Sequence, residues 1–535
     1  MAKRFTLYIT ILLLVGIGLA PVVSMFIKSL FVDGEFSLQN YETLFQSDRE
    51  WRLLFNSLAL AGATTLITVL LGVPLGTLFA KTDLPLKRFF TILFVIPLLI
   101  PSYILAIAWF YCLGRSGIVA MIFGVDVGIL TSNLLFGFAG TLFVMVSALL
   151  PVVIILTITY LRMVNPSLEE AAMLYGPWTT VLRKITIPLI TPGIALASLI
   201  VFILTLGEFG VPSSLRFDVY PVESFTQFSA FYNFNTATAA AIPLGLITLV
   251  ILIIERFFLR KKTFIFRTMG SEKKMLVVPL GKTKPFFLVA VSILVFIVVA
   301  VPLCILLHKS VSISAYTEAF IRSIGSIMRS LVYASIGATC LVVFGFFLGY
   351  ILERKAIRLS YAADSIAIFL FALPGSVIGI GLSSLWNTPE TNFIYASMCI
   401  IIFGYIAQYT ALGERIMAAT FSHVPHSMEE AAQIVGTGWF RRLSGILVPL
   451  AKRGMFATWF IGFIFCLRDI GITMMVYPPA HDTLPVRIFT LMANSPEDVI
   501  SALCVIMIMI TLLPLGGLGL VNKYVRGSSY GYVKR

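Results

Sequence analysis

Residues 167–193 read SLEEAAMLYGPWTTVLRKITIPLITPG, and residues 427–454 repeat the pattern as SMEEAAQIVGTGWFRRLSGILVPLAKRG. Each stretch carries acids, then bases, then a proline, which is typical of short amphipathic helices at a membrane surface. The surrounding chain of 535 residues is 59% hydrophobic and only 12% charged. A polar segment that recurs in so apolar a chain indicates two copies of one structural unit.

Apolar runs long enough to cross a bilayer recur along the whole chain, since a transmembrane helix needs roughly 20 mostly apolar residues. The sequence predicts an all-α integral membrane protein with twelve such helices. Their expected ranges are 7–30, 53–80, 89–113, 133–161, 188–207, 238–257, 285–307, 329–352, 362–386, 391–412, 454–476 and 500–521. The first run is too long for the apolar region of a cleaved signal peptide, so we expect it to be a span, with cleavage as the alternative.

The formal net charge of +14 is explained better by membrane topology than by nucleic-acid binding. With both termini in the cytoplasm, most of the 39 Lys and Arg fall in cytoplasmic loops, as the positive-inside rule requires. The most basic loop is 256–284, and it lacks the aromatic and basic pattern of a nucleic-acid module. We therefore expect this loop to fix the topology at anionic lipid, with the bilayer as partner and no nucleic acid.

The basic loop separates two halves of six spans that match in order. Gly72 and Gly76 correspond to Gly345 and Gly349, and Phe94-Val-Ile-Pro corresponds to Phe371-Ala-Leu-Pro. Because six is even, both halves enter the membrane in the same direction, which predicts a parallel repeat around a central path. The expected domains are a first repeat at 1–260, a linker at 261–284 and a second repeat at 285–535.

Both polar segments fall on the cytoplasmic side, in loops 162–187 and 413–453. Ser167 with Glu170, and Ser427 with Glu430, fit capping boxes that would begin a helix at each serine. One copy alone would be equally well explained as an interfacial helix that links two spans. Two copies at equivalent places favour a docking role. We predict as docking residues Glu169, Glu170, Ala171, Ala172, Gly176, Glu429, Glu430, Ala431, Ala432 and Gly436.

The pattern Glu-Ala-Ala-x3-Gly, followed by Ile-x-x-Pro, resembles the signature loop of permease subunits of binding-protein-dependent ABC importers with the type I fold. The first copy is one residue shorter than the second between Gly and Ile, with Gly176 and Ile185 against Gly436 and Ile446. The repeated unit covers nearly the whole chain and is most similar to the fused two-half permeases of ferric-iron and thiamine importers. The segments 468-RDIG-471 and 483-TLPVRIFTLM-492 resemble the iron branch.

This resemblance implies that the two loops are coupling helices that bind two copies of a cytoplasmic ATPase subunit. ATP and Mg²⁺ would be bound by those subunits, and this chain would bind no cofactor and no resident metal. A periplasmic or lipid-anchored binding protein would deliver a small solute. The acidic outer loops 33–50 and 481–498 would either contact that protein or simply follow from the topology. Ferric iron is the solute expected by resemblance, with thiamine, a polyamine or a phosphorylated small molecule as alternatives. The implied location is the bacterial inner membrane, with both termini in the cytoplasm.

The chain lacks the motifs that a catalytic subunit would carry. Gly281-Lys-Thr283 is the only P-loop candidate, and Leu276 stands where that motif needs glycine. The six cysteines and four histidines lack metal-site spacing, and no nucleophile motif argues for a membrane enzyme. A secondary transporter with two six-helix halves is the alternative. It would favour titratable residues in mid-span, where this sequence has almost none, and it leaves the two loops unexplained.

Charged residues end the fifth span of each half at equivalent positions. They are Glu208 in the first half and Arg468 and Asp469 in the second. Ionisable groups at such depth are costly and often functional, so we predict a translocation path or gate here. The alternative is that they lie in headgroups or water, with Arg468 and Asp469 paired.

Overall fold

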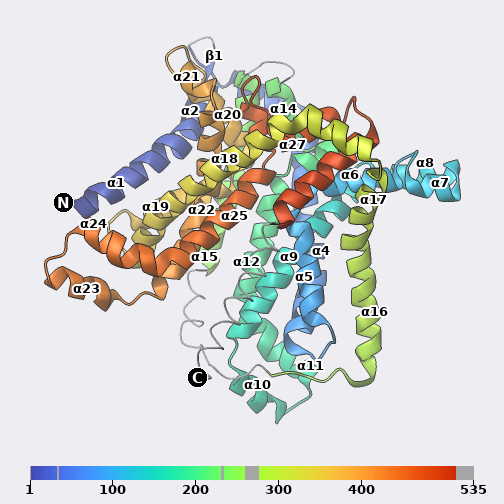
Figure 1. Ribbon diagram of the computed structural model, residues 1–535, viewed down its shortest axis with the longest axis horizontal. Helices are drawn as coiled ribbons and strands as arrows, with labels where there is room; N and C mark the ends of the chain where they lie inside the picture. Colours follow the sequence, from blue (N-terminus) through green and yellow to red (C-terminus); the bar gives the residue numbers. More distant parts are fainter. Residues whose placement is uncertain (1, 33–34, 230–233, 260–275, 514–535) are drawn as a thin grey trace.

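The computed structural model describes residues 2–32, 35–229, 234–259 and 276–513, and most of these are helical (Figure 1). The β structure among them is a small hairpin of β1 (Phe31–Val32) and β2 (Glu35–Phe36), together with a single bridge between Thr82 and Val278. Most of the expected linker, 261–275, and the end of the last expected span, 514–521, lie outside the described residues.

The first half runs from α1 to α15. Its elements are α1 (Ala2–Leu14), η1 (Val15–Leu19), α2 (Ala20–Ser29), α3 (Gln39–Gln46), α4 (Asp48–Lys81), α5 (Lys87–Leu99), α6 (Ser102–Leu113), α7 (Ile118–Phe123), α8 (Val125–Leu135), α9 (Phe138–Met163), α10 (Pro166–Met173), α11 (Trp178–Val181), η2 (Leu182–Thr186), α12 (Ile187–Leu206), α13 (Gly210–Ser214), α14 (Tyr220–Ser229) and α15 (Phe234–Leu259).

The second half repeats this order. Its elements are η4 (Gly281–Thr283), α16 (Lys284–Val295), η5 (Phe296–Ala300), α17 (Val301–Lys309), α18 (Ile313–Arg354), α19 (Ser360–Ala372), α20 (Gly375–Trp386), α21 (Asn392–Tyr395), α22 (Met398–Ser422), α23 (His426–Ile434), α24 (Trp439–Arg442), η6 (Leu443–Leu447), α25 (Val448–Arg468), α26 (Thr473–Val476) and α27 (Leu484–Leu491). A last helix occupies 497–513.

The number of spans differs from the expected twelve. Within the described residues, eight helices are long and apolar enough to cross a membrane, or nine if the bent pair α19–α20 counts as one span. The prediction of twelve is therefore not confirmed. Gln408, Glu414 and Arg415 make α22 more polar than a typical span, and α15 contains a shorter apolar stretch, Ala241–Ile254.

The second and fourth spans of each half pack closely through the matched glycines. A Cβ at Gly72 or Gly76 of α4 would lie 2.7 Å from a side chain of α9. A Cβ at Gly345 or Gly349 of α18 would lie 2.6 or 2.7 Å from the backbone of α22. Small residues four apart allow helix backbones to approach this closely in a membrane. The correspondence of these glycines between the halves is confirmed.

The third span of each half is broken at a proline. Pro101 precedes α6 with φ −53° and ψ 132°, and Pro374 precedes α20 with φ −54° and ψ 140°. The second break bends the chain by 108°. The proposed match of Pro97 with Pro374 was wrong by four residues, because Pro97 lies inside α5 and Pro101 is the structural counterpart.

Four π-helical turns occur at equivalent positions in the two halves. η1 and η5 interrupt the first span of each half, and η2 and η6 lead into the fifth. Each ends two residues before a proline: Pro21, Pro188, Pro302 and Pro449. Proline lacks an N–H and its ring clashes with the carbonyl four residues earlier, so the helix widens by one residue ahead of it.

Each half packs its first span against the other half. α1, η1 and α2 contact α18, α22 and α20, whereas η5 and α17 contact α5 and α6 (Figure 1). The two halves therefore interlock, and a relative movement of one half carries the first span of the other with it.

Candidate functional site

The two polar loops form short helices, α10 and α23, that lie well apart on the lower side of the molecule (Figure 1). Each is followed or ended by a pair of exposed, largely apolar side chains at the same position, Leu174 and Tyr175 in the first loop and Ile434 and Val435 in the second. These side chains are 81% to 92% exposed. Apolar side chains this exposed at matched positions are candidates for a contact with a partner. They were not among the predicted docking residues, although they directly precede the glycine in both copies.

The helices begin differently from the predicted capping boxes. α10 begins at Pro166, and the N–H of Ser167 donates to Oδ1 of the N-cap Asn165 at 3.1 Å. α23 begins at His426 after Pro425, which offers no side-chain cap. The capping-box prediction is therefore wrong. A proline fixes φ near the helical value, which moves the start of each helix ahead of the serine.

The first acid of the first loop is a buried anchor. Glu169 Oε2 lies 2.6 Å from the Nζ atom of Lys81, the last residue of α4, and both side chains are 0% exposed. The Thr186 hydroxyl donates to Glu169 Oε1 at 2.9 Å. A buried ion pair is maintained when its remaining hydrogen-bonding capacity is also satisfied, as here. The pair fixes α10 to the end of the second span.

The second loop has an equivalent anchor. The Arg354 guanidinium, at the end of α18, donates to Glu429 Oε1 at 3.0 Å and to the Val424 carbonyl at 2.8 Å. The Tyr350 hydroxyl donates to Glu429 Oε2 at 2.8 Å. Lys81 and Arg354 were missed in the sequence analysis. Each stands five residues after the second matched glycine of its half, a shared position that would have identified both.

The remaining predicted docking residues face outward to different degrees. The acids that follow the anchors, Glu170 and Glu430, are exposed. The first alanine of each pair, Ala171 or Ala431, is also exposed, whereas the second, Ala172 or Ala432, is half-buried. In each pair of acids the first therefore has an internal structural role, and only the second is available to a partner.

The two glycines that follow the helices do not have the same conformation. Gly436 has φ +80°, a left-handed value that favours glycine, and the N–H of Thr437 donates to the Ala432 carbonyl at 3.0 Å. Gly176 does not have a positive φ. Of these two glycines, only Gly436 therefore forms a left-handed helix cap.

The one-residue difference between the loops lies directly after the glycine. Trp178 and Trp439 begin the next helices, and they follow residues with nearly the same backbone angles, Pro177 at φ −66°, ψ 157° and Gly438 at φ −65°, ψ 162°. The additional residue of the second loop is Thr437. Both loops therefore enter α11 and α24 in the same way, and the difference is confined to the turn.

Two further contacts join other segments to the loop regions. Lys3 of α1 lies over the Tyr350 ring at 4.9 Å and the Trp439 ring at 5.5 Å, beside the second anchor. Near the first anchor, Asp83 pairs with Lys284 at 2.7 Å and accepts the Leu280 N–H at 2.9 Å. These two partners hold the pKa of Asp83 below its usual value.

A central cavity of about 130 Å³ lies between the two halves. The proline breaks of both third spans line it, together with the ends of α12 and α25. All three charged residues that were predicted for a path or gate line this cavity: Glu208, Arg468 and Asp469. The alternative, that they lie in headgroups or water, does not fit Asp469, which is 7% exposed.

The two carboxylates at the cavity have equivalent structural roles. Glu208 Oε1 accepts the N–H groups of Gly210 and Val211 at 3.1 and 3.3 Å, at the start of α13. Asp469 Oδ1 accepts those of Ile472 and Thr473 at 3.2 and 3.0 Å, at the start of α26. Carboxylates satisfy the free N–H groups of a helix start. Each fifth span therefore ends in a sharp turn that its own acid stabilises.

Arg468 connects the two halves. Its guanidinium donates to the carbonyl of Leu98 in α5 of the first half and lies 5.4 Å from the ring centre of Phe465. The pairing of Arg468 with Asp469, which belonged to the alternative reading, is not present: neither residue belongs to an ion pair in the described part of the chain. Asp469 instead accepts the Tyr409 hydroxyl at 2.7 Å.

Two buried polar atoms at the cavity have no hydrogen-bond partner among the described residues. They are the Tyr103 hydroxyl and Oε1 of Gln408, whose amide nitrogen donates to the Phe371 and Leu373 carbonyls at 2.9 Å each. Buried polar atoms usually have partners. These two therefore offer hydrogen bonds to whatever enters the cavity.

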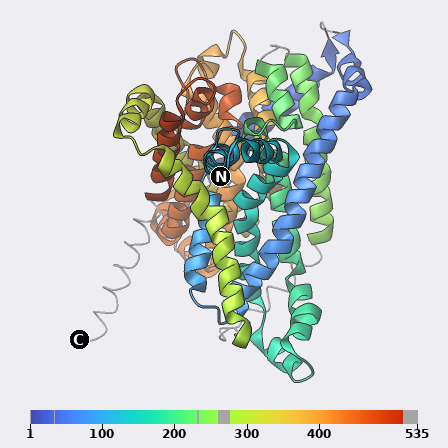
Figure 2. The same cartoon turned by 90° about the vertical axis from the view of Figure 1, so that its right-hand side faces the viewer.

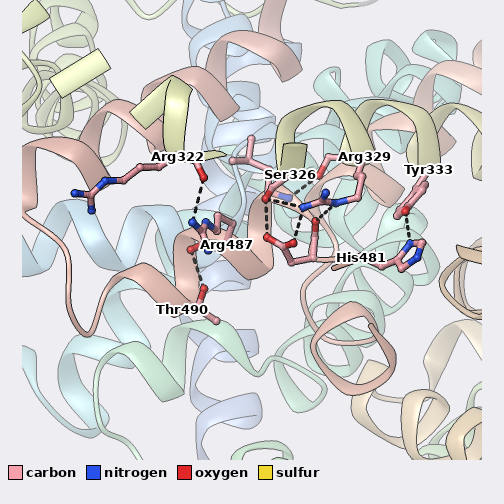
Figure 3. A network of polar contacts seen from close by, with 10 residues as sticks. Arg322, Ser326, Arg329, Tyr333, His481, Arg487 and Thr490 are labelled. Atoms are coloured by element: carbon pink, nitrogen blue, oxygen red, sulfur yellow. Dashed lines mark hydrogen bonds and ion pairs between the residues drawn. The ribbon is translucent and has the colours of Figure 1, made fainter. Parts of the chain in front are cut away.

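A polar network ties the middle of α18 to the segment before α27 (Figure 3). Arg329 pairs with Asp482 at 2.5 Å, and Tyr333 shares a hydrogen bond of 2.6 Å with Nδ1 of His481. Ser330 accepts the N–H of Leu484 at 2.6 Å. The first half has the same bond, from the N–H of Tyr220 to Ser57 at 2.9 Å. The repeat thus extends to both ends of the spans.

Residues 72–263 and 342–519 each match the model of a protein family described as the binding-protein-dependent transport system inner membrane component. The chain belongs to this family. It is a multi-pass inner-membrane permease component of a binding-protein-dependent ABC transporter and is not itself the catalytic subunit. Membership implies ATPase and binding-protein partners.

Several relatives are similar over much of their length. A putative ferric transport system permease protein of Haemophilus influenzae is 24% identical over 494 residues, 88% of this chain and 77% of the relative. An Fe(3+)-transport system permease protein of the same organism is 23% identical over 531 residues, 98% of this chain and 99% of the relative. A molybdenum transport system permease protein of Mycobacterium bovis is 28% identical over 199 residues, 37% of this chain and 74% of the relative.

Proposed function

We propose that this chain forms the complete transmembrane pore of an importer for ferric iron, with two ATPase subunits on the side of α10 and α23. One observation carries the proposal: each half presents a short helix with an exposed apolar tip, fixed by an equivalent buried acid to the end of the second span. A repeated surface suits a partner that is itself present in two copies.

The anchors connect each loop rigidly to the second span of its half. A force applied at Tyr175 passes through Glu169 to Lys81 and so to α4, and a force at Val435 passes through Glu429 to Arg354 and α18. Closure of the ATPase pair on ATP would draw the loops together and tilt the two halves as rigid bodies. ATP can shift this equilibrium because the ATPase pair binds it with different affinities in the two states.

In this proposal the central cavity is the gate of the pore. The bond from Arg468 to the Leu98 carbonyl spans the two halves, so it breaks when they separate. Separation would also expose Glu208, Asp469 and the free oxygen of Gln408 to the solute. In the state described here the loops lie apart and the cavity is small, which suits an inward-facing conformation closed on the opposite side (Figure 1).

Ferric iron is proposed because relatives named as ferric permeases align with most or all of the chain. The oxygen atoms of Glu208, Asp469, Tyr103 and Tyr409 at the cavity suit a hard cation or its complex. Thiamine, a polyamine or a phosphorylated small molecule are the alternatives. Solute selection would occur mainly on the separate binding protein.

The finer topology belongs to the same proposal. Counting α15, the broken α19–α20, α22 and the helix that begins at 497 with the eight clear spans gives twelve, six in each repeat. The repeats would occupy 1–260 and 285–535, joined by a cytoplasmic linker at 261–284, with both termini in the cytoplasm. The basic charge on that side supports this orientation.

The proposal is tested by reconstituting the chain with its ATPase and binding protein in sealed vesicles. We expect ATP hydrolysis to rise when iron-loaded binding protein is added, and labelled iron to accumulate only with ATP. Uptake that continues without ATP and stops when the proton gradient is dissipated would instead support a secondary transporter.

A further inference from the structure

A second cavity, of about 360 Å³, lies between α4, α14 and α15, next to Tyr41 of α3. This volume is in the range of small-molecule sites. Three aromatic side chains surround one part of it: Tyr41, Trp51 and Tyr220. Aliphatic side chains line the rest, among them Leu54, Leu246 and Ile247.

The acid in this cavity, Glu50, forms no ion pair with a cation among the described residues. Its Oε2 atom is buried and has no hydrogen-bond partner among the described residues. The nearby Glu223 differs, because Arg49 pairs with it at 2.7 Å and Gln227 donates to it at 2.7 Å. Arg49 therefore bonds to Glu223, and a buried carboxylate oxygen at Glu50 is left to accept a hydrogen bond from a ligand.

Tyr220 is a neutral neighbour of Glu50 in this cavity. Burial and the neighbouring Glu50 carboxylate raise the pKa of the Tyr220 hydroxyl, which is therefore neutral and donates a hydrogen bond to Glu50. The aromatic faces of Tyr41, Trp51 and Tyr220 also attract cations through their ring quadrupoles. An acid that is surrounded by aromatic side chains in this way favours binding of a cationic group.

The cavity lies at the membrane surface opposite the α10 loop. Glu50 and Lys81 are 31 residues apart on the same helix α4, which at 1.5 Å per residue is about 46 Å, more than the roughly 30 Å of bilayer hydrocarbon. Figure 2 shows α4 running from the α10 end to the hairpin end of the molecule. Trp51 is 51% exposed there, as in an interfacial aromatic belt.

An apolar stripe leads from the cavity along α15. Leu246 lines the cavity, and Leu249, Val250 and Ile253 follow at helical spacing on the same face. They are 41% to 57% exposed. A face with this spacing and exposure contacts hydrocarbon in a membrane protein. An amphipathic ligand would thus place a cationic head in the cavity and a chain on the stripe.

We propose that this cavity binds the headgroup of an aminophospholipid, with the ammonium group on Glu50 and an acyl chain along α15. The free carboxylate oxygen selects among zwitterionic lipids by their ammonium group, because it requires an N–H donor. The primary ammonium of phosphatidylethanolamine has three N–H donors, and the quaternary ammonium of phosphatidylcholine has none. The anionic headgroup of phosphatidylglycerol is repelled. This inference is independent of the transported solute.

The test is native mass spectrometry of the purified full chain, titrated with phosphatidylethanolamine, phosphatidylcholine and phosphatidylglycerol of identical acyl chains. We expect the wild type to retain phosphatidylethanolamine preferentially. Glu50→Gln should weaken that binding about tenfold, as expected for loss of one charge-assisted hydrogen bond, and leave the other two lipids unchanged. Glu42→Gln is the matched control, because Glu42 is an exposed acid next to Tyr41 that does not line the cavity.

A second variant keeps the test decisive if Glu50→Gln folds poorly. Leu246→Trp fills the aliphatic part of the cavity at an exposed position, and it should reduce retention of phosphatidylethanolamine while Glu50 is intact. Equal binding of phosphatidylethanolamine and phosphatidylglycerol by the wild type would overturn the proposal. So would unchanged binding in both variants, or a polypeptide retained at the cavity in place of lipid.

Discussion

Replacement of Glu169 by alanine tests the role of the first anchor. Its partner Lys81 is 0% exposed, and the bond of 2.6 Å to Glu169 is the ion pair that neutralises it. Removing one member of a buried pair leaves an uncompensated charge and costs about 3–5 kcal/mol. In contrast, Lys81→Met combined with Glu169→Leu removes both charges and should cost little, since apolar pairs often replace buried ion pairs without loss.

The matched controls for this prediction lie within the same loops. Glu170→Ala changes an exposed acid next to the anchor and should alter stability by less than about 0.5 kcal/mol. Glu429→Ala should cost less than Glu169→Ala, because Arg354 keeps its bond to the Val424 carbonyl and both side chains are slightly exposed.

The assay is the apparent Tm of each purified variant, followed by its uptake and ATPase activity with partner subunits. We expect Glu169→Ala to have the lowest Tm and the double variant to recover most of the loss. The reasoning would be refuted if Glu169→Ala and Glu170→Ala had the same Tm. A double variant less stable than Glu169→Ala alone would also refute it.

Three further predictions concern the loops and the cavity. Tyr175→Asp and Val435→Asp should each leave Tm unchanged and reduce ATPase-driven uptake, because both tips are exposed; unchanged uptake would exclude them from the contact. Gly436→Ala should cost roughly 1–2 kcal/mol, because φ is +80°, whereas Gly176→Ala should cost less; equal shifts in Tm would contradict this. Arg468→Met removes the bond between the halves and should raise the basal ATPase activity of the complex about tenfold. An unchanged rate would show that this bond does not hold the halves in the closed state.

The sequence was sufficient for the features that follow from pattern and repetition. The matched glycines indicated the repeat, and the structure gives the reason for the match: they allow α4 to approach α9, and α18 to approach α22, closely. The charge pattern singled out Glu208, Arg468 and Asp469, since ionisable groups at that depth are often functional, and all three line the central cavity.

Other features could not be read from local patterns. The choice between Pro97 and Pro101 as the break of the third span depends on packing against the other half, and both prolines fit a local motif. Glu169 and Glu170 are identical in sequence terms, and only the position of Lys81 decides which one is buried. Arg468 bonds to a carbonyl of the other half, and backbone carbonyls leave no signal in a sequence.

The most direct test of the central claim measures the distance between the two loop tips in different nucleotide states. Spin labels would be attached at Tyr175→Cys and Val435→Cys, in a chain whose exposed Cys304 is replaced by serine. Pulsed electron paramagnetic resonance would measure the distance between the two labels in the reconstituted complex, without nucleotide and with ATP under conditions that block hydrolysis. We predict that the distance shortens when ATP is bound. A distance that stays the same in both states would contradict the proposal that these loops couple an ATPase to the pore.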